Sequence, residues 1–114
     1  MERVCLSGTQ RVYLSGAISS CYDTYEQTFA SRQLDLERDG NIVINPALLP
    51  KGLDSDRYMP ICLAMIDACD TVYMMRGWED SAGARLEREY ALYHGKNVWY
   101  ETQIDYDKLD EVFR

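Results

Sequence analysis

Short runs of β-branched and aromatic residues alternate along the chain with longer segments in which apolar residues recur at helical spacing. The short runs favour strands, because branched side chains pack well on a pleated sheet. The strands that they predict lie within residues 11–20, 41–46, 70–75 and 96–101. The longer segments favour amphipathic helices, which bury one stripe of side chains. The predicted helices cover 22–40, the stretch from near Pro60 to 70, 81–94 and 105–113.

Residues with special backbone preferences mark the ends of these helices. Gly40 ends the first helix, and Gly95 ends the third, because glycine adopts the left-handed conformation common after a helix. Proline is well tolerated in a first helical turn, so the second helix is expected to begin near Pro60. Ser81 stands at or near the N-cap of the third helix. The apolar positions predicted for the first helix are Tyr25, Phe29, Leu34 and Leu36.

Strand and helix alternate to the end of the chain, which is typical of a parallel sheet with right-handed crossovers. We therefore predict one domain over 1–114, a small doubly wound α/β fold of the flavodoxin or Rossmann type, with four to five strands and helices on both faces. Such sheets bind ligands beyond the carboxyl ends of their strands, where the strand order reverses. The candidate binding residues at that edge are Ser15, Gly16, Ser19, Ser20, Asn45, Trp78, Ser81 and Gly83.

Charge narrows the range of partners. Nineteen acidic and twelve basic side chains give a formal net charge of −7, which argues against a nucleic-acid polymer or an anionic membrane as partner. A small nucleotide held by local donors stays compatible with this charge. No apolar run approaches the ~20 residues that span a bilayer, and the first residues lack the apolar region of a signal peptide. The sequence therefore predicts a cytoplasmic protein.

The cysteines do not form a metal-binding pattern. They lack a CxxC pair, and a single histidine accompanies them, so we predict neither a metal site nor another cofactor. Two alternatives remain for these residues: reduced cysteines that act as small core side chains, or a disulfide or redox pair. The four are Cys5, Cys21, Cys62 and Cys69.

One carboxylate stands out, because Glu87 falls on the small, apolar face of the third predicted helix. In one explanation its carboxylate reaches out to solvent or pairs with Arg85 or Arg88, as most buried charges are paired. In the other, Gly83 and Ala84 keep the neighbouring surface free of bulk, so that a ligand can reach the carboxylate. The helix N-terminus would then offer N–H groups to an anion one turn away.

Several segments together resemble the nucleoside 2-deoxyribosyltransferase superfamily. They are "YLSGAISS", "INPA", "MIDACDTVYMMRGWEDSAGARLEREYAL" and "GKNVWYE", and the resemblance covers 11–101. Within the superfamily the chain is most similar to a group of small phage and bacterial domains whose function is assigned mainly by this similarity. The resemblance implies an enzyme that acts on a 2′-deoxynucleoside or its 5′-monophosphate, as an N-glycosidase or a transferase. It also implies that the protein binds this small nucleoside or nucleotide. A further implication is that the protein forms a homo-oligomer.

The resemblance assigns roles to individual residues. Glu87 matches the nucleophile, which attacks the anomeric carbon and forms a glycosyl ester, and Tyr13 matches the tyrosine that positions it. Ser81 matches a serine that meets phosphate in a monophosphate hydrolase of the superfamily, although an N-cap explains it equally. Ser19 and Ser20 either add hydroxyls to that anion or cap the first helix. Trp78 either stacks on a base or covers the core.

Two positions depart from the pattern of the superfamily. Cys62 stands where active members carry an aspartate that assists departure of the base, and a thiol cannot replace a carboxylic acid there. Ala17 stands where the monophosphate hydrolase has a serine. The loss at position 62 supports an alternative in which the same crevice binds a nucleotide or nucleotide-derived signal without turnover. In a third alternative the domain is purely structural and Glu87 is a salt-bridged core residue.

Overall fold

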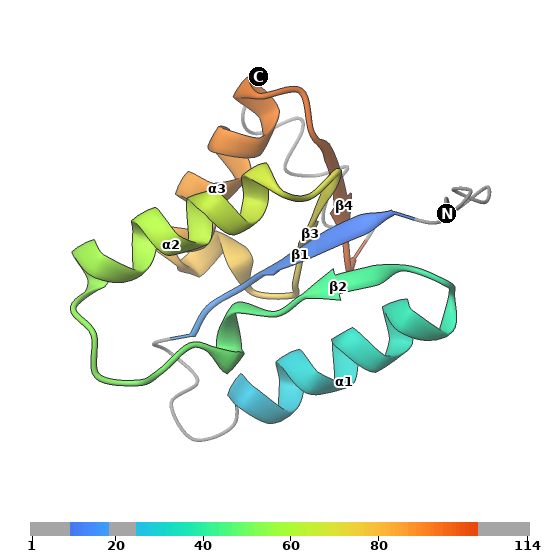
Figure 1. The fold of residues 1–114 in the computed structure, drawn as a ribbon, viewed down its shortest axis with the longest axis horizontal. Helices are drawn as coiled ribbons and strands as arrows, with labels where there is room; N and C mark the ends of the chain where they lie inside the picture. The colour runs from blue at the N-terminus through green and yellow to red at the C-terminus, as the bar shows by residue number, and fades with distance from the viewer. Residues whose placement is uncertain (1–9, 19–24, 103–114) are drawn as a thin grey trace.

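The strands of the sheet lie where the sequence predicts them. The computed structural model describes residues 10–18 and 25–102 (Figure 1), so Ser19, Ser20 and the helix predicted over 105–113 lie outside the described residues. All strand pairs in the sheet are parallel, and the spatial order is β2-β1-β3-β4. Their bounds are Arg11–Ser15 (β1), Ile42–Ile44 (β2), Thr71–Met74 (β3) and Asn97–Tyr100 (β4).

Helices cover both faces of this sheet. In Figure 1, α1 lies against one face, and α2 and α3 lie together against the other. The chain moves from β1 outward to β2 and then crosses β1 to reach β3, so the strand order reverses between β1 and β3. The predicted doubly wound α/β fold is confirmed. The helices are α1 (Tyr25–Arg38), α2 (Ser55–Asp67) and α3 (Ala82–Tyr93), with short 3-10 helices η2 (Pro46–Leu48) and η3 (Trp78–Asp80).

The central strand β1 supplies side chains to both faces of the sheet. Successive side chains of a strand point to opposite faces. Val12 and Leu14 accordingly join the core under α1, whereas Tyr13 joins the core under α2 and α3. Ser15, two residues after Tyr13, shares its face and is fully buried. One short strand therefore anchors two hydrophobic layers and carries two polar side chains toward α3.

Helix α2 begins earlier than predicted. It starts at Ser55, and Pro60 lies inside it. The backbone N–H groups of Arg57 and Tyr58 both donate to the carbonyl of Asp54, which starts the helix ahead of the proline. The Tyr58 hydroxyl also donates to the carbonyl of Pro50 and ties the first turn to the preceding loop. Pro60 lacks an N–H donor, but the donors of this first turn belong to residues before it, so the helix can begin ahead of the proline.

One predicted apolar position of α1 is wrong. Tyr25, Phe29 and Leu36 are buried as expected, but the Leu34 side chain is 52% exposed. At ~100° per residue, Leu36 returns close to the direction of Phe29, whereas Leu34 lies about 140° away from it. The helix therefore has a narrower buried stripe than its apolar residues suggest. No helix in the described part of the chain is long and apolar enough to span a bilayer.

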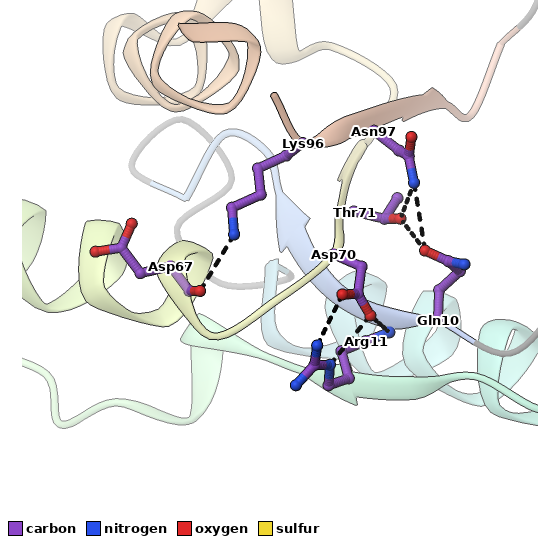
Figure 2. Close-up of polar contacts among 7 residues, drawn as sticks. All are labelled: Gln10, Arg11, Asp67, Asp70, Thr71, Lys96 and Asn97. Carbon is purple, nitrogen blue, oxygen red and sulfur yellow. Dashed lines mark hydrogen bonds and ion pairs between the residues drawn. The ribbon is translucent and has the colours of Figure 1, made fainter. Parts of the chain in front are cut away.

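A polar network joins the amino ends of β1, β3 and β4 (Figure 2). The Asp70 carboxylate accepts hydrogen bonds from the backbone N–H, Nε and Nη2 of Arg11, at 3.0, 3.0 and 2.8 Å. Beside it, Oε1 of Gln10 accepts from the Thr71 hydroxyl at 2.9 Å and from Asn97 Nδ2 at 3.3 Å. The hydrogen bonds from Arg11 hold the pKa of Asp70 below its usual range. This network lies at the opposite strand ends from the predicted binding edge.

Replacement of Asp70 by asparagine should lower the free energy of unfolding at pH 7 by about 1 kcal/mol, a modest effect because the pair is partly exposed. The pKa of Asp70 is lower in the folded state. Its stabilisation is therefore complete above the unfolded carboxyl pKa and is lost as the pH falls through the folded one. Urea denaturation of both proteins from pH 7 to pH 3 should show the difference shrinking, and Asp39→Asn serves as an exposed control. A difference independent of pH would contradict this role.

Candidate active site

Helix α3 presents Glu87 to the sheet. The Ser81 hydroxyl accepts a hydrogen bond from the Ala84 N–H at 3.2 Å and so caps the helix, which begins at Ala82. This start puts Ala84, Glu87 and Ala91 on the buried face, as the helical spacing predicts. The Glu87 side chain is only 7% exposed. A carboxylate thus sits among core residues near the carboxyl end of β1.

Two hydroxyl groups from β1 hold this carboxylate. The Tyr13 hydroxyl donates to Oε2 of Glu87 at 2.9 Å, and the Ser15 hydroxyl donates to Oε1 at 2.7 Å. The alternation of the strand puts both donors on the face that meets α3. Hydrogen bonds to a charged acceptor are stronger than neutral ones. The two oxygens of Glu87 are therefore satisfied by residues two positions apart in the sequence.

Glu87 is not paired with either of the arginines that flank it on α3. Arg85 donates instead to the carbonyl of Glu79 at 2.7 Å. Nε of Arg88 donates to the Tyr100 hydroxyl at 2.7 Å, and Nη1 of Arg88 pairs with Glu89. No ion pair to Glu87 occurs within residues 10–18 and 25–102. The explanation of Glu87 as half of a structural salt bridge is wrong for this part of the chain.

The thiol of Cys62 completes the surroundings of Glu87. Cys62 reaches the site from α2, where it is buried, and it interacts with both the Glu87 carboxylate and the Tyr13 hydroxyl. Burial raises the pKa of the Cys62 thiol, so the group is neutral at pH 7. Cys62 and Cys69 are both free and buried, as expected of core cysteines. Cys5 and Cys21 lie outside the described residues.

Burial and hydrogen bonding act on Glu87 in opposite directions. Burial raises its pKa above the usual range, and the hydrogen bonds from Ser15, Tyr13 and Cys62 partly offset that rise. Burial also raises the pKa of Tyr13 well above its ordinary value, with a further contribution from the Glu87 charge. Tyr13 therefore keeps its proton and remains a donor. The site combines one ionisable carboxyl group of raised pKa with neutral donors, and perturbed pKa values cluster at functional sites.

A hollow opens at the same edge of the sheet, where the strand order reverses. Its volume is about 220 Å³, and it begins at Ala17, two residues beyond Ser15. Gly16 allows the close approach of the strands there, since a Cβ at this position would lie 3.1 Å from the Cβ of Met75. The guanidinium of Arg76 has no ion pair within the described ranges. The lining residues are Ala17, Tyr25, Thr28, Phe29, Met75, Arg76, Gly77 and Asp80.

Two of the predicted binding residues have evident roles in the fold. Asn45 is buried; its Oδ1 accepts from the Ala47 N–H at 2.8 Å, and its Nδ2 donates to Gln33 at 3.0 Å. Trp78 is only 3% exposed and belongs to the core under α2 and α3. The Arg88 guanidinium lies 5.3 Å from the centre of its ring. Trp78 thus covers the core, as one alternative held, and contact of either residue with substrate stays a prediction.

The surface beside Gly83 is less open than the sequence suggests. A Cβ on Gly83 would lie 3.5 Å from the terminal methyl of Met59, at ordinary contact distance. Ala84 is buried in the core rather than lining an open face. The approach to Glu87 is therefore bounded by Met59 and does not run along a bare helix surface.

Sequence reasoning did not identify two features of the site. The sequence marks Cys62 as the position of a lost acid but not as a contact of Glu87, although its spacing from Ile66 on the same helix indicates a buried position. Arg76 carried no motif that marked it. In the described part of the chain, no cluster of three or more His, Cys, Asp or Glu side chains is placed to hold a metal ion.

The comparisons with known proteins agree with this architecture. Residues 10–100 match a family described as Domain of unknown function (DUF4406). No curated protein sequence matches the chain. Among solved structures the fold is similar to "2-desoxiribosyltransferase from Leishmania mexicana", with a TM-score of 0.65 and 19% sequence identity. The match covers 80% of this chain but only 63% of that one. At this identity the likeness shows the fold of the chain.

Replacement of Glu87 by glutamine should raise the free energy of unfolding at pH 7 by about 1 kcal/mol, because it removes a buried charge that has no cation among the described residues. The folded pKa of Glu87 is raised. Ionisation therefore weakens the fold as the pH rises above the unfolded carboxyl pKa, and the gain from glutamine should vanish at lower pH. Thermal and urea unfolding across this range test the expectation, with Glu89→Gln on the exposed face of α3 as control. A loss of stability at pH 7 would favour a structural role for Glu87.

Proposed function

We propose a function for this chain, which belongs to the DUF4406 family of unknown function: it cleaves or transfers the deoxyribosyl group of a 2′-deoxynucleoside or its 5′-monophosphate. Glu87 is the nucleophile in this proposal, and Tyr13 orients it. The structural neighbour, a 2-desoxiribosyltransferase, and the motif resemblance support the same reaction class. The proposed substrates are small nucleosides or nucleotides.

The observation that carries this proposal is the state of Glu87. A carboxylate in this position is 7% exposed, has no cation in the described ranges, and receives a hydroxyl on each oxygen. Burial of a charge without a cation costs stability, so selection for the fold alone would not favour it. The carboxylate also lies close to the edge where doubly wound sheets bind ligands.

The chemistry proceeds in two displacements. One oxygen of Glu87 attacks the anomeric carbon, a C1′–O bond forms, and the C1′–N bond breaks through an oxocarbenium-like state. The electron pair of the broken bond passes to the base nitrogen, which takes a proton from water. Water or a second base then attacks C1′ and loses a proton to solvent, and the ester bond breaks to restore the Glu87 carboxylate. The Tyr13 hydroxyl holds Oε2 throughout.

The group at position 62 limits departure of the base. A neutral thiol with a raised pKa is a weak proton donor, so Cys62 gives little help to a leaving purine or pyrimidine. Slow turnover is therefore expected. The same observation favours a second candidate function, in which the crevice binds a nucleotide without turning it over.

Two features support a nucleotide substrate rather than a free nucleoside. Ser81 occupies the position that resembles a phosphate-binding serine, and it lies at the start of a 12-residue helix. Arg76 lines the hollow at the same edge of the sheet, on the side of α1, with a cation that is unpaired within the described ranges, in a chain whose net charge is −7. The 5′-phosphate is the anionic group that these residues suit.

Incubation with a panel of 2′-deoxynucleosides and their 5′-monophosphates should release free base, which chromatography measures. Glu87→Gln should reduce release at least 10³-fold, because it removes the covalent step. Glu89→Gln, on the same helix, should retain full activity. Equal release by the Glu87 variant and the wild type would contradict the assignment of the nucleophile.

An aspartate at position 62 should accelerate base release. Cys62→Asp supplies a carboxylic acid beside the site, and general acid catalysis contributes roughly 10²–10⁴-fold where it is well placed. We expect about a tenfold rise in kcat, because a second carboxyl beside Glu87 also disturbs the ionisation of both. Cys62→Ser, which keeps a small neutral group, is the matched control. If both variants match the wild type, proton donation at this position does not limit the reaction.

The panel also distinguishes the second candidate function. Absence of base release with every substrate, together with a raised melting temperature in the presence of one nucleotide, would indicate a receptor. Only a ligand that binds the folded state raises that temperature. Absence of both effects would contradict both candidate functions and would favour the alternative of a purely structural domain.

A further inference from the structure

The side chain of Glu87 ends in a torsion that one hydrogen bond does not fix. The bond between Cγ and the carboxylate is an sp³–sp² torsion, whose energy profile is broad and roughly two-fold. The hydrogen bond from Tyr13 restrains Oε2 but leaves Oε1 free to swing about it. A nucleophile must approach the anomeric carbon in a defined orientation, and small misplacements are costly. A second restraint on the carboxylate is therefore needed.

We propose that Ser15 is a positioning residue for the nucleophile: its buried hydroxyl, acting with that of Tyr13, fixes the plane of the Glu87 carboxylate against the sugar. The Ser15 Oγ lies 2.7 Å from Oε1, the oxygen that Tyr13 does not hold. Two donors on two oxygens remove the rotation that one donor leaves. This inference rests on the proposed function, in which Glu87 is the nucleophile.

The position of Ser15 is itself fixed from both sides. Its backbone carbonyl accepts a hydrogen bond from the Met75 N–H at 2.8 Å, and its Cα pairs with that of Met74 across the sheet. The residue is 0% exposed, and its hydroxyl is engaged with Glu87. Substrate contact was the role predicted for Ser15, but a fully buried hydroxyl suits orientation of Glu87 better.

The electrostatic surroundings give this hydrogen bond a measurable effect. The groups that act on Glu87 are Ser15 and Tyr13 from β1 and Cys62 from α2. Burial raises the pKa of Glu87, and the Ser15 hydrogen bond is the largest contribution that lowers it. On α3, Arg88 faces Tyr100 instead. Among the described residues of β3 and β4, no titratable side chain contributes to this balance.

The first test follows the titration of Glu87 directly. Glutamate labelled with ¹³C at the carboxyl group reports ionisation by NMR, and Glu87→Gln identifies the resonance. Ser15→Ala should move the Glu87 midpoint to higher pH, and Ser15→Cys, a weaker donor of similar size, should fall between it and the wild type. Ser31→Ala, an exposed serine on α1, should cause no change. An unchanged midpoint in both Ser15 variants would overturn the proposal.

Kinetics supply the second test with the best substrate of the panel. Ser15→Ala should lower kcat about tenfold and leave KM within about twofold, since positioning acts in the transition state. A raised KM with unchanged kcat would show that Ser15 contacts substrate and would overturn the proposal. The NMR titration needs no substrate, so it tests the hydrogen bond from Ser15 to Glu87 even if the panel gives no turnover. Failure of the panel would instead count against the proposed function. If Ser15→Ala does not fold, Ser15→Cys carries both measurements.

Discussion

A carboxylate removed from water without a cation constrains everything around it. Transfer of such a charge into a protein interior is costly unless hydrogen-bond donors replace the lost solvent. In this chain three separate elements supply the surroundings of Glu87: β1 with two hydroxyls, α2 with a thiol, and α3 with the carboxylate itself. The relative positions of β1, α2 and α3 must therefore be maintained, because no other described residue contributes a hydrogen bond to Glu87.

The two ends of the sheet divide the tasks of stability and chemistry. At the amino ends, Arg11 and Asp70 clamp β1 to the loop that precedes β3 with charged hydrogen bonds. At the carboxyl ends, the same strand offers Ser15 to Glu87. A strand of five residues thus carries an anchor at its first position and a site residue at its last. The division agrees with the general rule that parallel sheets place ligand sites beyond their carboxyl ends.

Local patterns made most of the fold predictable. The strands, the cap at Ser81 and the buried face of α3 each follow from spacing and from residue types with known backbone preferences. The start of α2 was harder to predict from the sequence, because its first turn depends on a carbonyl and a tyrosine hydroxyl that tie it to the preceding loop. Leu34 is exposed because its angular position on α1 lies away from the buried stripe, and apolar character alone does not fix that position.

The hydrogen-bond partners of Glu87 could be predicted only in part from the sequence. The superfamily resemblance pointed to Tyr13, but Ser15 lies 72 residues from Glu87 in sequence, and no local signal links the two. Their contact depends on the parallel register that places β1 beside β3 and under α3. The choice between the two roles of Trp78, stacking on a base or covering the core, also depended on tertiary packing, which places Trp78 in the core. The periodic pattern of apolar residues along the chain does not predict contacts between residues so far apart in the sequence.

The alternation of β1 also separates two kinds of evolutionary change. Val12 and Leu14 pack under α1, while Tyr13 and Ser15 face α3. Substitutions that repack the α1 layer therefore act on side chains that do not touch Glu87. An insertion or deletion of one residue within the strand is different, since it would turn the side chains beyond it to the opposite face. The length of β1 should consequently drift far less among descendants of this gene than the composition of the layer beneath α1.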